Sequence, residues 1–589
     1  MLEGDRPPDL SGSLEQLQQQ TNTALQQLRT VLNDLSKRTE TAINQQNTYI
    51  TEAQQQSSAQ QATIATQVTQ LETRVSGLYS NLESFKRELT ALTLQKQEQT
   101  VEKSPVAVPE EETSAPTFDH LIPQLPTEDN FDLDINLGID FGTGYTKVCF
   151  RDVARDQSEV VTFAEPTQGK LNLAATLMPT RLSILKDGTL LTGLTVEEWE
   201  SDNRPIQTQI DYIKMRLAAI DLRQQNKEEE WRLEQIPELD DDDTVESLCA
   251  YYLSRVIARS QQWIRQNKPD LFTNQTVRWS VNIGVPVEYC DSPALKRFEK
   301  VLALAWLLKS TDVDTSAINI EQLNQLIKHL QQWMDSNKTM DELDCTTTPE
   351  IVAAMWSFIN SRQAQEGFYT FFDIGDGTLD GAAFIFNRTD GDRQVDCYIG
   401  QVEPLGVSAF VEKTASELNQ STDQVRRSLG TEIKDEDTAL QAKMQQSNTR
   451  KKVQKMVANV VMSGNEKHGQ MRKYSVSQDI GENLKVFVGG GGSNTAFFPQ
   501  TIHATHDDFQ QSSADIPPYE IKQIPTPTDL SINGLDKKDF NRFAIAYGLC
   551  IPEGEGPSIR LPSQFDKVES GAETSNHRPD KYEDGKDLM

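Results

Sequence analysis

The sequence predicts an α/β fold for the larger part of the chain, preceded by an α-helical coiled coil. Between about residues 134 and 560, short segments rich in β-forming residues alternate with helical segments, a pattern typical of layered α/β lobes. Residues 10–98 differ from the rest, because they are rich in Gln, Thr and Ser, contain no proline and place apolar residues at heptad spacing. The two parts therefore belong to different structural classes.

Length and composition together predict four regions. A chain of 589 residues is too long for one hydrophobic core, which favours several domains. The regions expected are a coiled coil at residues 10–98, a disordered linker at 99–130, an α/β domain at 134–560 and a polar tail at 561–589.

The second half of the N-terminal region repeats apolar residues every seven positions. One series is Ile64, Leu71, Leu78, Phe85 and Leu92, and the other, offset by four positions, is Val68, Val75, Leu82 and Leu89. Val or Leu at one seam position with mostly Leu at the other favours a parallel two-stranded coiled coil, so residues 64–92 predict a homodimer. The alternative interpretation is one long solvated helix packed on the α/β domain.

The linker and the tail are expected from composition alone. Residues 99–130 contain several prolines and the acidic run 110–112, a combination that cannot bury a core. Residues 561–589 are also polar and show no strand pattern.

The overall charge argues against one class of partner. The formal net charge is −31 at pH 7 and the sequence pI is about 4.7, whereas binding to nucleic-acid phosphates needs clustered Lys and Arg. No nucleic-acid partner is therefore expected, and any anion-binding site must supply its own local positive groups.

Cysteine usage and hydropathy predict the compartment. The six cysteines are scattered without CxxC spacing, which indicates neither a zinc site nor a disulfide framework. The N-terminus lacks a basic region followed by an apolar one, and no apolar run approaches the ~20 residues that span a bilayer. A cytoplasmic protein with reduced thiols and no membrane span is expected.

Three glycine-rich turns follow apolar, strand-like segments. They lie at residues 137–148 (LGIDFGTGYTKV), 371–381 (FFDIGDGTLDG) and 486–494 (VFVGGGGSN), and in the first two an aspartate precedes the glycines. Glycine lets the backbone approach a phosphate with its N–H groups pointing inward, and an acidic residue at a strand end can hold the water shell of a magnesium ion. Two facing turns would form a phosphate clamp, and the third could lie against a purine or a ribose.

The order of these three turns resembles the phosphate-1, phosphate-2 and adenosine motifs of the actin and heat-shock protein 70 ATPase superfamily. Residues 279–287 (WSVNIGVPV) are similar to a strand and turn of DnaK-type chaperones, and residues 349–355 (PEIVAAM) to one of their helices. Residues 540–550 (FNRFAIAYGLC) predict a closing helix and resemble the end of the chaperones' ATPase domain. The resemblance covers residues 134–560. It implies a two-lobed actin-like ATPase fold with duplicate, ribonuclease H-like lobes, divided near residue 370, that binds ATP or ADP with Mg²⁺.

The resemblance also implies roles for individual residues. Asp140 and Asp373 match the aspartates that hold hydrated magnesium, and Glu350 matches the glutamate near the attacking water. Lys214 resembles the lysine that reaches the γ-phosphate. Without the resemblance, Glu350 is interpreted as a helix N-terminal acid and Lys214 as an exposed helical lysine. The residues expected to contact the nucleotide are Gly142, Thr143, Gly144, Tyr145, Lys147, Gly375, Asp376, Gly377, Thr378, Gly489, Gly490, Gly491, Gly492 and Ser493.

Some features depart from the chaperone pattern. Lys147 and Asp376 match actin rather than the chaperones. The segment nearest to the chaperones' adenine-gripping helix is residues 423–429 (DQVRRSL). After residue 560 too few residues remain for a peptide-binding domain, so a self-sufficient chaperone is not expected.

Together these implications predict an ATP-binding, slowly ATP-hydrolysing molecular switch. Lobe closure would be transmitted through the coiled coil to a protein partner that the sequence does not identify. The alternatives are a nucleotide-gated actin-like filament, which Lys147 and Asp376 favour, a small-molecule kinase of the same fold, and a pseudo-ATPase scaffold.

Overall fold

The described part of the chain is essentially the predicted α/β domain. The computed structural model describes residues 118, 121–125, 131–164, 173–222, 235–337, 342–389, 391–430, 438–472, 482–552 and 554–565. The predicted coiled coil at 10–98, its dimer seam at 64–92, most of the linker at 99–130 and residues 566–589 of the tail lie outside the described residues, and they stay predictions.

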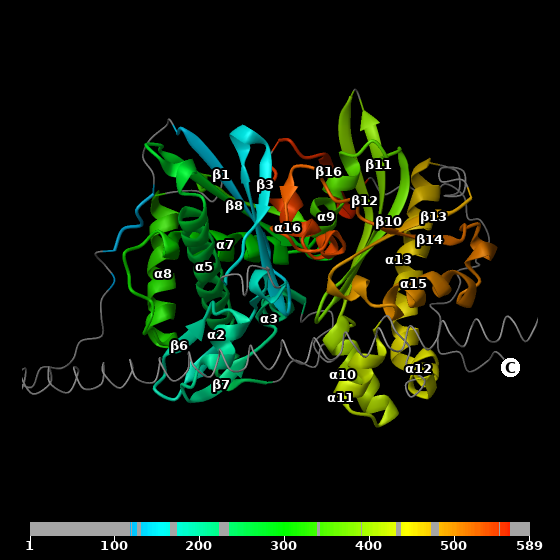
Figure 1. Cartoon of the computed structure of the whole chain (residues 1–589), viewed down its shortest axis with the longest axis horizontal. Coiled ribbons are helices and arrows are strands. Elements are labelled where there is room, and N and C mark those ends of the chain that lie inside the picture. Colours follow the sequence, from blue (N-terminus) through cyan, green and yellow to red (C-terminus); the bar gives the residue numbers. More distant parts are fainter. Residues whose placement is uncertain are drawn as a thin grey trace, which may run out of the picture. The chain divides into compact units, whose positions relative to one another are not determined.

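Two large mixed sheets form the framework (Figure 1). Five strands of each follow the same spatial order. The first sheet contains β3 (Gln157–Val160), β2 (Tyr145–Asp152), β1 (Leu133–Asp140), β8 (Val277–Val285) and β9 (Cys345–Pro349). The second contains β12 (Asp392–Glu403), β11 (Leu379–Thr389), β10 (Gly367–Ile374), β13 (Leu484–Gly489) and β14 (Tyr519–Gln523). In each sheet the first three strands of this order form an antiparallel meander. The last two extend the sheet in parallel from β1 in the first sheet and from β10 in the second. The protein is therefore an α/β protein with mixed sheets, as predicted.

Shorter strands complete the β structure. β15 (Leu530–Ser531) pairs in parallel with β3, β4 (Met178–Pro179) pairs antiparallel with β2, and β16 (Ser558–Arg560) pairs in parallel with β12. A separate antiparallel sheet consists of β6 (Leu190–Thr192), β5 (Leu182–Leu185) and β7 (Ile206–Ile210).

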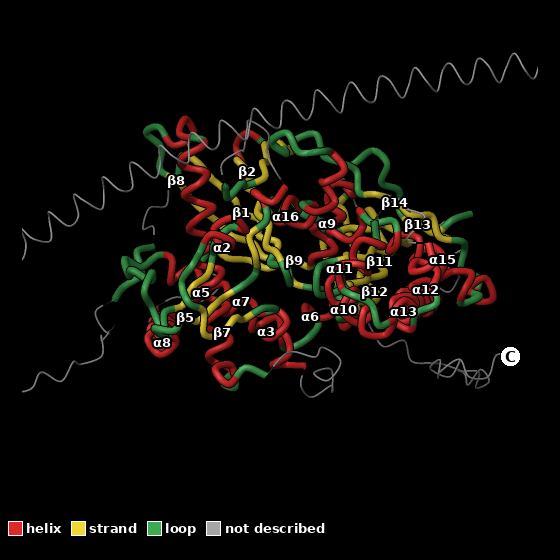
Figure 2. The backbone as a smooth tube through the Cα atoms, turned by 60° about the horizontal axis from the view of Figure 1, so that its bottom comes forward, coloured by secondary structure: helices red, strands yellow, loops and turns green. Residues whose placement is uncertain are grey.

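Helices connect the parallel strands, because such strands cannot be joined by tight hairpins. Up to β9 the helices are α2 (Val196–Ser201), α3 (Ile213–Leu222), α5 (Asp242–Asn267), α6 (Val287–Cys290), α7 (Ala294–Lys309) and α8 (Ile320–Asn337). After β12 they are α10 (Val407–Leu418), α11 (Thr422–Ser428), α12 (Thr438–Gln445), α13 (Asn448–Arg472) and α15 (Phe497–Asp508). Figures 1 and 2 show two further helices, α9 (Glu350–Ile359) and α16 (Ala544–Leu549), between the two large sheets.

The contact of α16 with α9 and with β1 is close because glycines lie in it. A Cβ added to Gly548 would lie 1.9 Å from the carbonyl oxygen of Ala353, and one added to Gly138 would lie 2.2 Å from that of Ala546. The apolar residues of α9 and α16 belong to one buried cluster with residues of β10 and β11. The helix expected at residues 349–355 is confirmed as α9, and the closing helix expected at 540–550 is confirmed as α16 and the 3₁₀ turn Lys537–Arg542 before it.

The packed part of the chain continues past residue 560. Phe565, which composition assigned to the polar tail, is only 5% exposed, and its ring lies 5.6 Å from that of Tyr398 between centroids. Arg560 of β16 forms an ion pair with the buried Asp396 of β12 at 2.5 Å. The six cysteines all lie in the described part, as free thiols.

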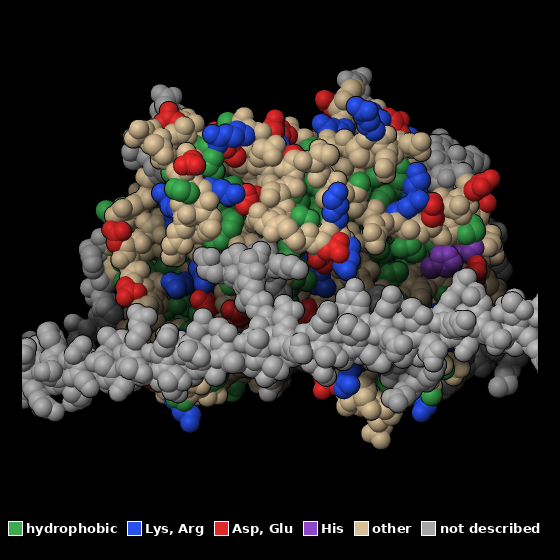
Figure 3. Space-filling view, viewed as in Figure 1, with side chains coloured by type: hydrophobic (Ala, Val, Ile, Leu, Met, Phe, Trp, Pro, Cys, Tyr) green, Lys and Arg blue, Asp and Glu red, His purple; other side chains and the backbone are tan. Residues whose placement is uncertain are grey.

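The described surface carries both charge signs. On the face seen in Figure 3, Lys and Arg side chains are interspersed with Asp and Glu. Within the described ranges, no helix combines the length and the apolar character that crossing a membrane requires.

Candidate functional site

The two Asp-Gly turns of the sequence occupy equivalent places in the two large sheets. In the first, Asp140 at the end of β1 is paired across its turn with Lys147 of β2. In the second, Asp373 near the end of β10 is paired across its turn with Asp380 of β11. The spacing is seven residues in both turns, so Lys147 and Asp380 stand at corresponding positions with opposite charge.

The turns also touch each other. The hydroxyl oxygens of Thr143 and Thr378 lie 3.4 Å apart. A Cβ added to Gly144 would lie 2.5 Å from Oδ2 of Asp376, and one added to Gly377 would lie 2.5 Å from Cγ2 of Thr143. The turns meet this closely because glycine occupies both points of contact.

Both turns open into one cavity of about 550 Å³. The residues expected at the site that line it are Asp140, Gly142, Thr143, Gly144, Tyr145, Lys147, Lys214, Glu350, Asp373, Gly375, Asp376, Thr378, Gly490, Gly491 and Gly492. Three expected residues are not in the lining. Gly377 packs on Thr143, Gly489 pairs with Asp373 in the sheet, and Ser493 donates a hydrogen bond to the carbonyl of Gly490 at 2.8 Å. The tertiary structure thus brings segments more than 300 residues apart to one cavity.

Sequence reasoning missed part of the lining. The residues not expected there are Leu173, Ala174, Leu177, Asp380, Val407, Arg426, Leu429, Gly430, Thr495 and Arg542. Asp380 belongs to the second Asp-Gly motif, and Arg426 and Leu429 belong to the segment nearest to the chaperones' adenine-gripping helix. All three therefore lie in sequence segments that already pointed to the site. Arg542 belongs to residues 540–550, which resemble a chaperone segment, but its place beside Gly491 depends on how the 3₁₀ turn packs.

Lys214 and Glu350 form a buried ion pair in the cavity wall. Nζ of Lys214, at the start of α3, donates a hydrogen bond to Oε1 of Glu350 at 2.5 Å. The side chains are 7% and 3% exposed, so the interpretation of Lys214 as an exposed helical lysine is wrong. The ammonium also lies 5.9 Å from the ring centroid of Phe141. Glu350 is both the first residue of α9 and a residue of the site.

Burial and like charges raise the pKa of three acids of the cavity, Asp373, Asp380 and Glu350. Burial, followed by the charge of Asp140, raises the pKa of Asp373 to about 7. Burial and Glu350 raise the pKa of Asp380 well above its ordinary value. Burial also raises the pKa of Glu350, against the opposing effect of Lys214. For Lys214 itself, burial alone would lower the pKa, but Glu350 and Asp380 outweigh it and raise it.

The acids at the base of the cavity suit a cation. Asp140 forms an ion pair with Lys147 at 2.5 Å, whereas the buried Oδ1 atoms of Asp373 and Asp380 accept no hydrogen bond from the described residues. Within the described ranges, no three His, Cys, Asp or Glu side chains are placed to hold one metal ion directly. The pair expected from the sequence, Asp140 and Asp373, places one carboxylate from each turn in the cavity lining, and a hydrated divalent cation held by them stays a prediction.

Helix α10 holds the second turn in place. The backbone N–H of Val407 donates to the carbonyl of Gly375 at 2.9 Å, and that of Ser408 donates to the carbonyl of Asp376 at 2.8 Å. The hydroxyl of Ser408 donates to Oδ1 of Asp376 at 2.6 Å and accepts from Arg426 at 2.9 Å. The carboxylate of Asp376 therefore has a structural partner, which orders the turn.

The cavity thus combines glycine turns with backbone N–H groups, two lysines that are each paired with an acid, buried carboxylates and two arginines. Together these groups can bind a phosphorylated ligand with a cation. Comparisons with known proteins add no family to this description: the sequence matches no protein-family model and no curated protein.

Proposed function

We propose that this protein is an ATP-binding, ATP-hydrolysing molecular switch of the heat-shock protein 70 and actin type, with a two-lobed fold of duplicate, ribonuclease H-like lobes. One observation carries the proposal. Two sheets of the same strand order each present an Asp-Gly turn at the same position, and both turns open into one cavity. Two equivalent turns that face one cavity would form a phosphate clamp, with one turn on each side of the ligand.

The glycine turns would hold the phosphates. Gly142, Gly144 and Gly375 let the backbone of the turns reach the cavity with no side chain in between, and Thr143 and Thr378 add hydroxyls at the point where the turns meet. The N–H groups of Gly142 and Gly375 already donate to the carbonyls of Asp140 at 2.9 Å and Thr378 at 3.0 Å, so they serve to shape the turns. Lys147 adds a positive charge at the first turn. Magnesium, when bound, neutralises the charge that develops on the transferred phosphate, and Asp140 and Asp373 would hold its water shell.

Glu350 would orient the attacking water. It lines the cavity at the N-terminus of α9, and the hydrogen bond from Lys214 limits the positions that its carboxylate can take. Lys214 would keep Glu350 in place and stabilise negative charge at the γ-phosphate. Because Lys214 has a raised pKa, it stays protonated in this role.

The base and the ribose would lie against the third glycine turn. Gly490, Gly491 and Gly492 line the cavity beside Arg542, whose Nη1 lies 2.6 Å from the position of a Cβ on Gly491. A planar guanidinium at this place suits stacking on a purine. Leu429, in the segment after α11, supplies an apolar contact at the same cavity.

A nucleotide-gated actin-like filament is the second candidate. The observation that favours it is the ion pair of Lys147 with Asp140 in the cavity, because Lys147 is the residue that resembles actin rather than the chaperones. In the switch proposal, signals pass to a protein partner through a dimeric coiled coil at residues 64–92. In the filament proposal, nucleotide controls assembly.

The test is ATP binding and turnover with magnesium, measured on the full chain together with its mass by light scattering. Asp373→Asn is expected to lower turnover by about 100-fold or more, since one ligand of the metal's water shell is lost. Asp392→Asn, an exposed acid at the start of β12, is the matched control and should keep wild-type turnover. Wild-type protein that fails to bind ATP with magnesium would refute the proposal. A defined small oligomer supports the switch, and growth of mass with ATP supports the filament.

A further inference from the structure

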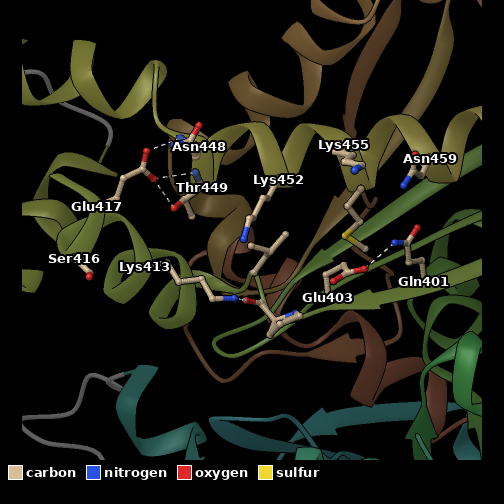
Figure 4. Close-up of a pocket in the computed structure, with 13 residues that line it drawn as sticks. Gln401, Glu403, Lys413, Ser416, Glu417, Asn448, Thr449, Lys452, Lys455 and Asn459 are labelled. Atoms are coloured by element: carbon tan, nitrogen blue, oxygen red, sulfur yellow. Dashed lines mark hydrogen bonds between the residues drawn. The ribbon is translucent and has the colours of Figure 1, made fainter. Parts of the chain in front are cut away.

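A second cavity, of about 700 Å³, lies outside the candidate site. It is bounded by the end of β12, by α10 and by α13, and none of its lining residues lines the first cavity (Figure 4). Its lining consists of Gln401, Glu403, Pro404, Leu405, Lys413, Ser416, Glu417, Asn448, Thr449, Lys452, Lys455, Met456 and Asn459. A cavity of this size is in the range that holds small molecules.

Three lysines supply the positive charge of this cavity. Figure 4 shows Lys413 of α10 and Lys452 of α13 directed toward the same space. Lys413 is held by a hydrogen bond to the carbonyl of Pro404 at 2.6 Å. Lys452 and Lys455, one turn apart on α13, are exposed, and neither has a carboxylate of the described residues within 4.0 Å.

The two acids in the lining already have partners. Glu417 accepts hydrogen bonds from the backbone N–H groups of Asn448 at 2.6 Å and Thr449 at 3.1 Å, so it caps the N-terminus of α13. Partial burial alone would raise the pKa of Glu417, but these hydrogen bonds and the nearby charge of Lys452 lower it. Glu403 accepts a hydrogen bond from Gln401 at 2.8 Å. Neither acid therefore neutralises Lys452 and Lys455 by direct contact.

We infer that this second cavity binds a small organic phosphate. All three cations are lysines, whose compact ammonium groups bind phosphate as point charges. The side chains of Gln401, Asn448 and Asn459 offer amide groups for the hydroxyls of such a ligand. The lining contains three lysines and two glutamates, so against a charge of −31 for the chain as a whole it is a local exception with a positive balance that attracts anions. This inference does not depend on the proposed function.

Lysine labelling can test the site directly on the full chain. Inorganic pyrophosphate serves as the probe, and an amine reagent followed by mass spectrometry reports each lysine separately. We expect pyrophosphate to slow the labelling of Lys452 and Lys455 by about threefold or more, as ion pairing with phosphate requires. Lys451, exposed on the same helix but not in the lining, should not change. Sulfate at equal ionic strength controls for general screening.

Calorimetry of pyrophosphate binding gives the second readout. Lys452→Ala/Lys455→Ala is expected to weaken binding at this cavity by about tenfold or more, whereas Lys443→Ala/Lys451→Ala, with the same change in charge, should change it by less than about twofold. Equal protection of Lys451, equal protection by sulfate, or no protection of Lys452 and Lys455 would overturn the inference. Site-resolved labelling also separates this cavity from phosphate binding at the first one, so failure here leaves the proposed function standing.

Discussion

Nζ of Lys214 lies 2.5 Å from Oε1 of Glu350, and the two residues come from helices that are 136 positions apart in the sequence. Both side chains are buried, and such an ion pair adds little net stability because both charges lose their hydration. The ion pair therefore matters for where its two charged groups lie rather than for stability. It fixes a carboxylate and an ammonium at the wall of the cavity where the proposed reaction occurs.

Removing one partner of this pair should be costly. Lys214→Met keeps much of the side-chain volume but leaves Glu350 buried without its cation, and we expect the free energy of unfolding to fall by about 3–5 kcal/mol. Urea unfolding measures the change. In the double variant Lys214→Met/Glu350→Gln, which removes both charges, most of the lost stability should return. A single variant as stable as the wild type would show that the pair does not exist as described.

The pH dependence of stability should reveal Asp373. Its pKa is raised from 3.8 in the reference state to about 7 in the fold, so the folded state binds the extra proton between these values. The contribution of Asp373 to the free energy of unfolding is therefore full below about pH 4 and is lost as the pH rises toward about 7. The shift in pKa corresponds to a loss of at most about 4 kcal/mol. The actual loss should be smaller, because Asp373 partly faces the cavity. The test compares the free energy of unfolding of metal-free wild type and of Asp373→Asn at about pH 5 and about pH 8. The variant should not show the loss of stability between these pH values, because it lacks the titrating carboxyl group. Identical pH profiles would contradict it.

The closeness of the two turns predicts the effect of a single methyl group. In Gly144→Ala, the new Cβ would lie 2.5 Å from Oδ2 of Asp376, so the turns must separate. We expect ATP affinity to fall by about 10- to 100-fold, because displacement of the turns misplaces their phosphate-binding N–H groups. Gly556→Ala is the control, since nothing lies within 4 Å of a Cβ there. Equal affinities of the two variants for ATP would count against a clamp made by both turns.

Arg542 should matter for binding the nucleotide rather than for its hydrolysis. Arg542→Ala removes the guanidinium beside Gly491, and we expect weaker binding of both ATP and ADP by about 2- to 30-fold, with turnover at saturating ATP unchanged. Arg427→Ala, an exposed arginine on α11 outside the lining, is the matched control. A loss of turnover at saturation with intact affinity would place Arg542 at the phosphates instead of the base.

Local pattern was sufficient to predict much of the fold and of the site. Each Asp-Gly turn combines a buried apolar strand, an acid and glycines within about 12 residues, and such short signals follow from backbone sterics and burial. β1, β10, α9 and α16 accordingly lie where the sequence predicts them. The seven-residue spacing that pairs Asp140 with Lys147 and Asp373 with Asp380 can likewise be read from the sequence once the two turns are aligned.

The strands β1 and β10, the helices α9 and α16, the two acidic glycine turns and the site candidates Asp140, Glu350 and Asp373 could be predicted from local sequence and the family resemblance. The burial of Lys214 against Glu350, the place of Arg542 beside Gly491 and the second cavity shared by Lys413 and Lys452 follow from tertiary packing. These relationships join side chains from elements that are distant in sequence or that meet only through packing. Burial and pairing of that kind depend on how helices and sheets pack in three dimensions, whereas strands and turns depend on neighbouring residues.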